Sequence, residues 1–269
     1  MRSFSLRNGL LAMVGLIMTS SAAMAGPKDF HKVDATSETI VDHSAWNDIL
    51  ASYINRTEDN RTEFSYSTVT DADKQKLNSY IDALSSIDPT TLTRDESFAY
   101  WANLYNAVTV DVILDNYPVK SIMRITSGLR PGPWKRKLIS INGEKLTLDN
   151  IEHDILRDFF KDNRVHYAVN CASYGCPNLA GKAFTSENLE EMLEAGARDY
   201  VNHPRGVTVK NGKVTASSIY KWFAADFGNN QAGVLKHLRK YAEPELQEQL
   251  SGVTKINKYD YSWALNDAK

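Results

Sequence analysis

The residues best suited to chemistry gather in one stretch of the chain. Its only two cysteines, Cys171 and Cys176, follow two of its six histidines, His153 and His166, and Glu152 precedes them all. A cysteine becomes a nucleophile when a nearby base takes its proton and a third group orients that base. These residues therefore predict a catalytic site of papain-like logic for acyl transfer or amide hydrolysis, in which Cys171 attacks, a histidine relays the proton and Glu152 orients the imidazole.

The choice of histidine depends on the local structure. Residues 166–170 (HYAVN) are typical of a short buried strand, on which His166 and Cys171, five apart, would face opposite sides unless the chain turns between them. His153 lies on an expected helix, 148–160, that can pack against the cysteine loop, so it is the preferred partner. Glu152 and His153 are neighbours and do not face each other on a helix.

Two other interpretations use the same side chains. In an oxidising compartment an even pair of cysteines favours a Cys171–Cys176 disulfide, and the four intervening residues do not fit the two-residue gap of a thioredoxin-type motif. His153, His166 and both cysteines have the ligand types that suit zinc, although structural zinc sites usually pair residues two to four apart. All three interpretations stay open, and we assign no metal and no cofactor.

A second polar group lies on the helix expected over residues 93–116. Asn103 and Asn106 are three apart and share one face, and Tyr105 lies between them. The two amides either face solvent, cap a neighbouring loop or line a cleft, where they could hold a carbonyl group or an oxyanion. With Ser173 of the cysteine loop, these residues are the candidate binding residues.

Hydrophobic spacing and turn residues predict a helix-rich α+β fold, a single domain with a small, mostly antiparallel sheet built from hairpins. Asn142-Gly143 and Asn211-Gly212 are the residue pairs that best accept a tight hairpin turn. Helical spacing covers residues 44–54, 71–88, 93–116, 148–160, 185–202, 217–228 and 231–241. Strands are expected at residues 62–67, 136–141, 145–147, 166–170, 207–210, 213–216 and 259–263.

Composition and the N-terminus narrow the class of protein. The chain has 269 residues, of which 42% are hydrophobic and 24% charged, with a net charge of −2. A pI of 6.3 gives no electrostatic reason to expect nucleic-acid binding. A mean hydropathy of −0.40 excludes a polytopic membrane protein. Basic residues, a short apolar core and Ala23-Met24-Ala25 predict a secretory signal peptide over residues 1–25, cleaved near Ala25. We therefore expect a periplasmic or secreted protein with a polar lead-in, 26–43, one globular domain, 44–269, and no membrane span after cleavage.

The sequence resembles the family named domain of unknown function 547. The resemblance rests on residues 98–107 (FAYWANLYNA), 148–153 (LDNIEH), 166–173 (HYAVNCAS), Cys176-Pro177, the helix at 185–202 and residues 259–266 (YDYSWALN). It implies that one site brings together Asn103, Asn106, Glu152, His153, His166 and Cys171, and it implies no activity. Bacterial members with signal peptides look like envelope proteins.

Two functional hypotheses follow. The first is an exported thiol-dependent enzyme of acyl transfer or amide hydrolysis with Cys171 as nucleophile. The second is a non-catalytic envelope binding module, in which a Cys171–Cys176 disulfide shapes a loop that holds a small molecule or a peptide. The sequence identifies neither the ligand nor the oligomeric state.

Overall fold

The computed structural model describes residues 27–126 and 128–268, so the predicted signal peptide lies outside the described residues. The fold is α+β, as predicted: helices dominate and the strands form small sheets. Among the described residues, no helix combines the length and the apolar character needed to cross a membrane.

Helices outnumber strands along the described chain, and most strands come in consecutive pairs between them. The helices, including short 3-10 turns and the π-helix η5, are η1 (Pro27–Phe30), α1 (Ser44–Tyr53), η2 (Tyr66–Thr68), α2 (Asp71–Ser85), η3 (Pro89–Thr91), α3 (Arg94–Asn116), η4 (Ile122–Arg124), η5 (Asn150–Phe160), α4 (Val165–Ala168), α5 (Leu189–Asn202), α6 (Ile219–Trp222), η6 (Ala224–Phe227), α7 (Gln231–Tyr241) and α8 (Pro244–Gln249). The strands are β1 (Ile54–Arg56), β2 (Thr62–Phe64), β3 (Ile139–Ile141), β4 (Glu144–Leu146), β5 (Val207–Lys210), β6 (Lys213–Ser217) and β7 (Lys258–Asp260).

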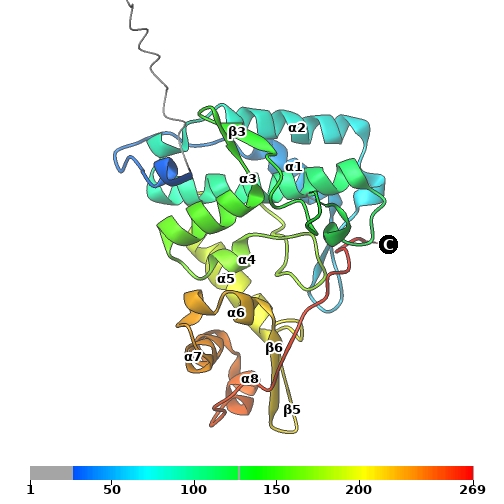
Figure 1. Cartoon of the computed structure of the whole chain (residues 1–269), viewed down its shortest axis with the longest axis vertical. Helices are drawn as coiled ribbons and strands as arrows, with labels where there is room; N and C mark the ends of the chain where they lie inside the picture. Colours follow the sequence, from blue (N-terminus) through cyan, green and yellow to red (C-terminus); the bar gives the residue numbers. More distant parts are fainter. Residues whose placement is uncertain (1–26, 127, 269) are drawn as a thin grey trace, which may run out of the picture.

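Helix α3 is the centre of a helical layer that also contains α1 and α2 (Figure 1). Its start follows from its sequence, because the Thr93 side chain accepts a hydrogen bond from the Glu96 N–H and two acids, Asp95 and Glu96, lie in the first turn. Almost every residue from Glu96 to Ile113 is buried, so α3 is surrounded by protein on all sides. Its polar side chains must therefore find partners inside the molecule.

Both predicted Asn-Gly hairpins are confirmed. Strands β3 and β4 pair antiparallel around Asn142-Gly143, and β5 and β6 pair antiparallel around Asn211-Gly212. Each of these four turn residues has a positive φ, which asparagine and glycine accept most readily. Strand β7 joins β6 in parallel, and β1 and β2 form a third small sheet, so the strands form separate small sheets.

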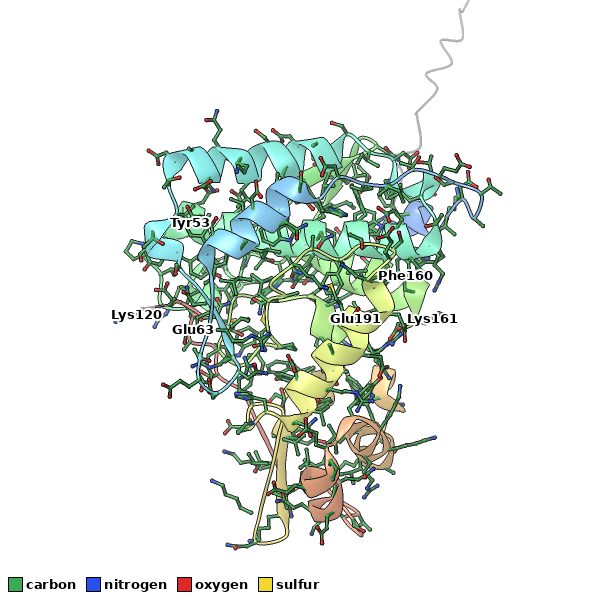
Figure 2. All side chains as sticks on the ribbon, turned by 180° about the vertical axis from the view of Figure 1, so that it is seen from behind. Tyr53, Glu63, Lys120, Phe160, Lys161 and Glu191 are labelled. Atoms are coloured by element: carbon green, nitrogen blue, oxygen red, sulfur yellow. A yellow bond between two sulfur atoms is a disulfide. The ribbon has the colours of Figure 1, made fainter. Side chains whose placement is uncertain are left out.

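A second hydrophobic cluster lies below the helical layer. It contains the buried residues of β5, β6 and α7 with the C-terminal half of α5, which descends from the upper layer near Glu191 (Figures 1 and 2). After β7 the chain returns from this lower part to the upper one (Figure 1). This returning segment, residues 261–267, pairs with the cysteine loop through Gly175 N–H···O=C Ser262, at 2.9 Å, and Tyr174 N–H···O=C Ala264, at 2.7 Å. It therefore carries the aromatic residues near the C-terminus to the cysteines.

The strand predicted at residues 166–170 is wrong. Residues Val165–Ala168 form the short helix α4, because Asp162 starts a turn: its side chain accepts from Arg164 N–H and its carbonyl group from Val165 N–H. The N–H of Val169 then bonds to the Val165 carbonyl group and closes the helical turn. His166 therefore does not follow the alternation of a strand. The predicted strand at residues 62–67 is also shorter, since β2 ends at Phe64 and a 3-10 turn follows.

Candidate functional site

The cysteines lie in the wall of a cavity of about 160 Å³ between the helical layer and the lower part. It is lined by residues from both parts of the molecule: Tyr105, Trp134, Asp149, Glu152, His153, His166, Val169, Cys171, Cys176, Pro177, Ile219, Trp222, Phe223, Tyr261 and Trp263. Five of the predicted site residues are therefore brought to one place: Tyr105, Glu152, His153, His166 and Cys171. Asn103, Asn106 and Ser173 are not in the lining.

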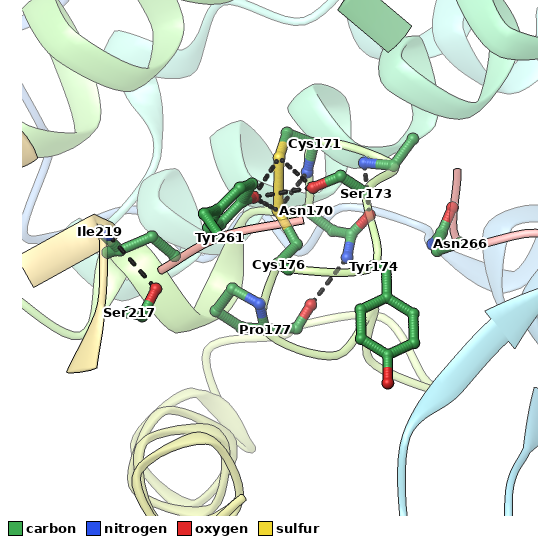
Figure 3. Close-up of a disulfide and its surroundings, with 12 residues drawn as sticks. Asn170, Cys171, Ser173, Tyr174, Cys176, Pro177, Ser217, Ile219, Tyr261 and Asn266 are labelled. Atoms are coloured by element: carbon green, nitrogen blue, oxygen red, sulfur yellow. Dashed lines mark hydrogen bonds between the residues drawn. A yellow bond between two sulfur atoms is a disulfide. The ribbon is translucent and has the colours of Figure 1, made fainter. Parts of the chain in front are cut away.

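Cys171 and Cys176 form a disulfide (Figure 3). The loop between them is held by Asn170, whose side chain accepts a hydrogen bond from Ala172 N–H at 2.8 Å and donates one to the Pro177 carbonyl group at 2.7 Å. Ala172 adopts a φ of +54°, a region that costs a residue with a Cβ about 1 kcal/mol. The surrounding hydrogen bonds thus impose a specific shape on this loop.

The hydroxyl group of Tyr261 points at the disulfide (Figure 3). Its oxygen lies 3.2 Å from each of the two sulfur atoms and 2.7 Å from the Ser173 hydroxyl group. Burial raises the pKa of Tyr261 well above its ordinary value, so the hydroxyl group keeps its proton at neutral pH. Ser173 is 1% exposed, and its hydroxyl oxygen lies 3.3 Å from Cys171 Sγ.

His166 forms a pair with an acid that is sixty residues away in the sequence. Its Nε2 lies 2.7 Å from Oδ2 of Asp226, which also accepts a hydrogen bond from Arg157 Nε at 2.6 Å. Partial burial raises the pKa of Asp226, but the hydrogen bonds from His166 and Arg157 outweigh it and hold the pKa well below its ordinary value. The imidazole stacks on Phe223, with ring centroids 4.3 Å apart. His166 is therefore oriented by Asp226.

His153 has a different set of neighbours. Its Nδ1 lies 3.2 Å from Nη1 of Arg157 and 3.8 Å from Oε1 of Glu152, and its Nε2 lies 3.8 Å from Oδ1 of Asp149. The other oxygen of Glu152, Oε2, accepts a hydrogen bond from the Tyr105 hydroxyl group at 2.9 Å. The hydrogen-bond partners of Cys171 Sγ are the hydroxyl groups of Ser173 and Tyr261, and neither histidine is among them.

The two asparagines of α3 bind backbone groups. Asn106 donates to the Ala168 carbonyl group and accepts from Asn170 N–H, both at 2.8 Å. Asn103 makes the same pair of bonds to Phe184, at 2.8 and 3.0 Å. Both side chains are buried, so Asn106 cross-links α3 to the end of α4 and to Asn170, and Asn103 cross-links α3 to the segment before α5. In this geometry they position the cysteine loop and the segment before α5.

Sequence reasoning missed most of the aromatic wall and the acid that pairs with His166. Trp222 and Phe223 follow Ile219 at helical spacing, and Tyr261 and Trp263 alternate as on a strand, so helix and strand formation alone account for these residues in the sequence. No sequence signal connects Asp226 with His166.

The described residues contain no group of three or more His, Cys, Asp or Glu side chains arranged to hold a metal ion. Both sulfur atoms are bonded to each other, so neither is available as a thiolate ligand. The candidate site is therefore an aromatic cavity with two histidines, two carboxylates and a disulfide in its wall.

Comparison with known proteins identifies one family. The model of the family described as "Protein of unknown function, DUF547" matches residues 89–201. No curated protein and no solved structure matches the chain. The matched segment contains all the predicted site residues, whereas Trp222, Phe223, Tyr261 and Trp263 lie beyond it. The predicted resemblance is confirmed over this segment: the family model matches residues 89–201 of the chain.

Proposed function

We propose that this chain is an exported binding module that holds part of a small molecule or peptide in the cavity beside the Cys171–Cys176 disulfide. The observation that carries the proposal is the disulfide itself: it forms one wall of the cavity and leaves no thiol to act as a nucleophile. Disulfides persist in the oxidising compartment that the predicted signal peptide leads to. The half-exposed ring of Trp222 at the cavity, 48% exposed, also fits a ligand-binding surface.

Binding is tested by NMR, because the five tryptophans include their own control. Trp134, Trp222 and Trp263 line the cavity, whereas Trp46 and Trp101 are buried in the core. A set of uncharged, cationic and anionic fragments of about ten heavy atoms is added to the oxidised protein. At least one fragment is expected to shift the three cavity indole resonances and to leave those of Trp46 and Trp101 in place. If no fragment does so, the binding proposal is wrong.

Export is tested on the full chain. When the protein is produced with its own N-terminus in a Gram-negative host, we expect it in the periplasmic fraction, and its intact mass should correspond to a chain that begins at Gly26. A chain that stays in the cytoplasm with residues 1–25 attached would contradict the proposed location.

Thiol-dependent acyl transfer is the second candidate, and one observation favours it. His166, oriented by Asp226, lies in the wall of the same cavity as Cys171. An external dithiol would reduce the disulfide and become oxidised itself. The Cys171 thiol would then pass its proton to an imidazole and attack an acyl carbon, and the imidazole would return that proton to the leaving amine or alcohol. Water would hydrolyse the thioester and regenerate the thiol.

The two functions differ in their need for reductant. If the second candidate is correct, the protein hydrolyses an activated acyl ester, such as 4-nitrophenyl acetate, only after the disulfide has been reduced. This activity must also be lost in Cys171→Ser and in His166→Ala. The matched control is Cys176→Ser, which retains Cys171 and both histidines. Equal rates in the reduced wild type and in reduced Cys171→Ser would exclude the second candidate.

A further inference from the structure

The cavity wall has a chemistry that selects among ligands. Trp222, Tyr261 and Trp263 form one continuous aromatic surface, with ring centroids 4.8 to 5.6 Å apart. Trp134 continues it, 5.7 Å from Trp263. The face of an aromatic ring carries partial negative charge and attracts cations, and tryptophan does so most strongly.

The charged side chains of the cavity also favour a cation over an anion. Asp149 and Glu152 are the carboxylates of the lining, and among the described residues no lysine or arginine belongs to it. Lys135 pairs with Asp149 at 3.0 Å, but its side chain is 56% exposed and lies outside the lining. An anion in this cavity would face two carboxylates and the negative faces of the rings, whereas a cation would be attracted by both.

Glu152 is the more informative acid, because it is only 8% exposed. Its Oε2 is satisfied by the Tyr105 hydroxyl group. Its Oε1 has no hydrogen bond within the described part of the chain, and Nδ1 of His153 is 3.8 Å away. This oxygen is not among the fully buried side-chain atoms that lack a partner, so it remains accessible from the cavity, where it can accept a hydrogen bond from a positively charged or hydrogen-donating ligand.

The size of the cavity limits the ligand to a compact group. A dry cavity of about 150 Å³ in another protein holds one benzene molecule, and this cavity has about 160 Å³. It therefore has room for an ammonium centre with its methyl or methylene substituents, and the remainder of a larger ligand would lie outside, along Trp222.

We infer that the cavity binds a compact organic cation, an alkylated ammonium group, between the aromatic surface and Glu152. This inference rests on the proposed binding function and names its ligand class. The residues responsible lie partly inside the DUF547 segment, as Glu152 does, and partly beyond it, as the rings of Trp222, Tyr261 and Trp263 do.

The test compares three probes of nearly equal shape on the oxidised protein. They are choline, its uncharged isostere 3,3-dimethylbutan-1-ol, and 3,3-dimethylbutanoate. Dissociation constants are taken from the shifts of the Trp134, Trp222 and Trp263 indole resonances. We expect choline to bind at least about tenfold more tightly than the alcohol and the anion to bind most weakly.

Two variants assign the effect to named groups. Glu152→Gln keeps the size of the side chain and its contact with Tyr105, and it should remove most of the preference for choline over the alcohol. Trp222→Ala removes a half-exposed ring and should weaken choline binding about threefold or more. Asp158→Asn, an exposed carboxylate of the same helix outside the lining, is the matched control and should change nothing.

The outcomes separate this inference from the function it rests on. If the alcohol or the anion shifts the cavity resonances as strongly as choline does, the binding function stands and the cationic ligand class is wrong. If none of the three probes shifts these resonances, the inference is overturned, and the fragment set then decides the binding function. Unchanged Trp46 and Trp101 resonances show that each variant is folded.

Discussion

Removing the side chain of Asn106 should destabilise the protein through the cysteine loop. In Asn106→Ala two buried backbone groups lose their partners, the carbonyl oxygen of Ala168 and the N–H of Asn170. A buried polar group left without a partner costs about 1–3 kcal/mol, and alanine recovers about 0.5 kcal/mol through its higher helix propensity. Two such groups together cost about 2–6 kcal/mol, so after this recovery we expect the free energy of unfolding to fall by about 1.5–5.5 kcal/mol.

Urea denaturation of the oxidised protein measures this change, and amide hydrogen exchange locates it. The exchange of the Asn170 N–H should become faster in Asn106→Ala, because Asn106 is its acceptor. The matched control is Asn116→Ala on the same helix, where the side chain bonds, among the residues that the structure describes, only to the Val112 carbonyl group one turn earlier. This control should change stability by no more than about 0.5 kcal/mol. A loss below about 1 kcal/mol in Asn106→Ala, with unchanged exchange at Asn170, would show that Asn106 does not hold the loop.

Three further predictions concern stability and the cavity. Burial, with smaller contributions from nearby positive charges, lowers the pKa of His237 to about 4. As the pH falls from 6.5 to 4, the unfolded chain therefore binds a proton at this histidine that the folded chain does not bind. The free energy of unfolding should fall by about 3 kcal/mol over this range. Urea denaturation across this range should show a shallower pH dependence in His237→Gln, and an equal slope would contradict the assignment. In Gly175→Ala, the new Cβ would lie 2.9 Å from backbone atoms of Ser262, so the returning segment must shift. We expect the free energy of unfolding to fall by about 1–3 kcal/mol and choline to bind more weakly by NMR. Unchanged choline affinity would refute the role of this contact. Reduction of the Cys171–Cys176 disulfide should lower the free energy of unfolding by about 2 kcal/mol, the loop-closure value for a ring of this size. The control variant Cys171→Ser/Cys176→Ser should show no response to reductant in the same denaturation assay. An equal response in both proteins would mean that the reductant acts elsewhere.

The parts of the fold that could be predicted are those determined by local chemistry. Asn142-Gly143 and Asn211-Gly212 accept the positive φ of a tight turn, so both hairpins could be located from the sequence. The apolar repeat over residues 93–116 likewise predicted α3 to within one residue. The segment at residues 166–170 failed because a short apolar run has no period of its own, and the Asp162 turn decided its conformation.

The parts of the site that escaped prediction depend on contacts between distant segments. His166 and Asp226 are sixty residues apart, and Cys171 and Tyr261 ninety, so no spacing rule connects them. The asparagines of α3 illustrate the same limit. Their shared face was visible in the sequence, but the Ala168 and Asn170 backbone groups that Asn106 binds were not.

The position of the aromatic surface suggests how ligand specificity is divided in this chain. The disulfide, both histidines and Glu152 lie within residues 89–201, the segment matched by the family. Three of the rings that face them come from Trp222, Tyr261 and Trp263. We therefore expect changes at these rings to alter ligand preference while the disulfide and the pair of His166 with an acid are retained.

The state of the two cysteines tests the central claim most directly. Protein isolated without reductant is treated with iodoacetamide under native conditions, and its intact mass is measured before and after reduction. We predict no labelling before reduction and two labels after reduction and unfolding, because Cys171 and Cys176 are bonded to each other. A single label on Cys171 without any reductant would contradict the binding module and leave the thiol-dependent enzyme as the better account.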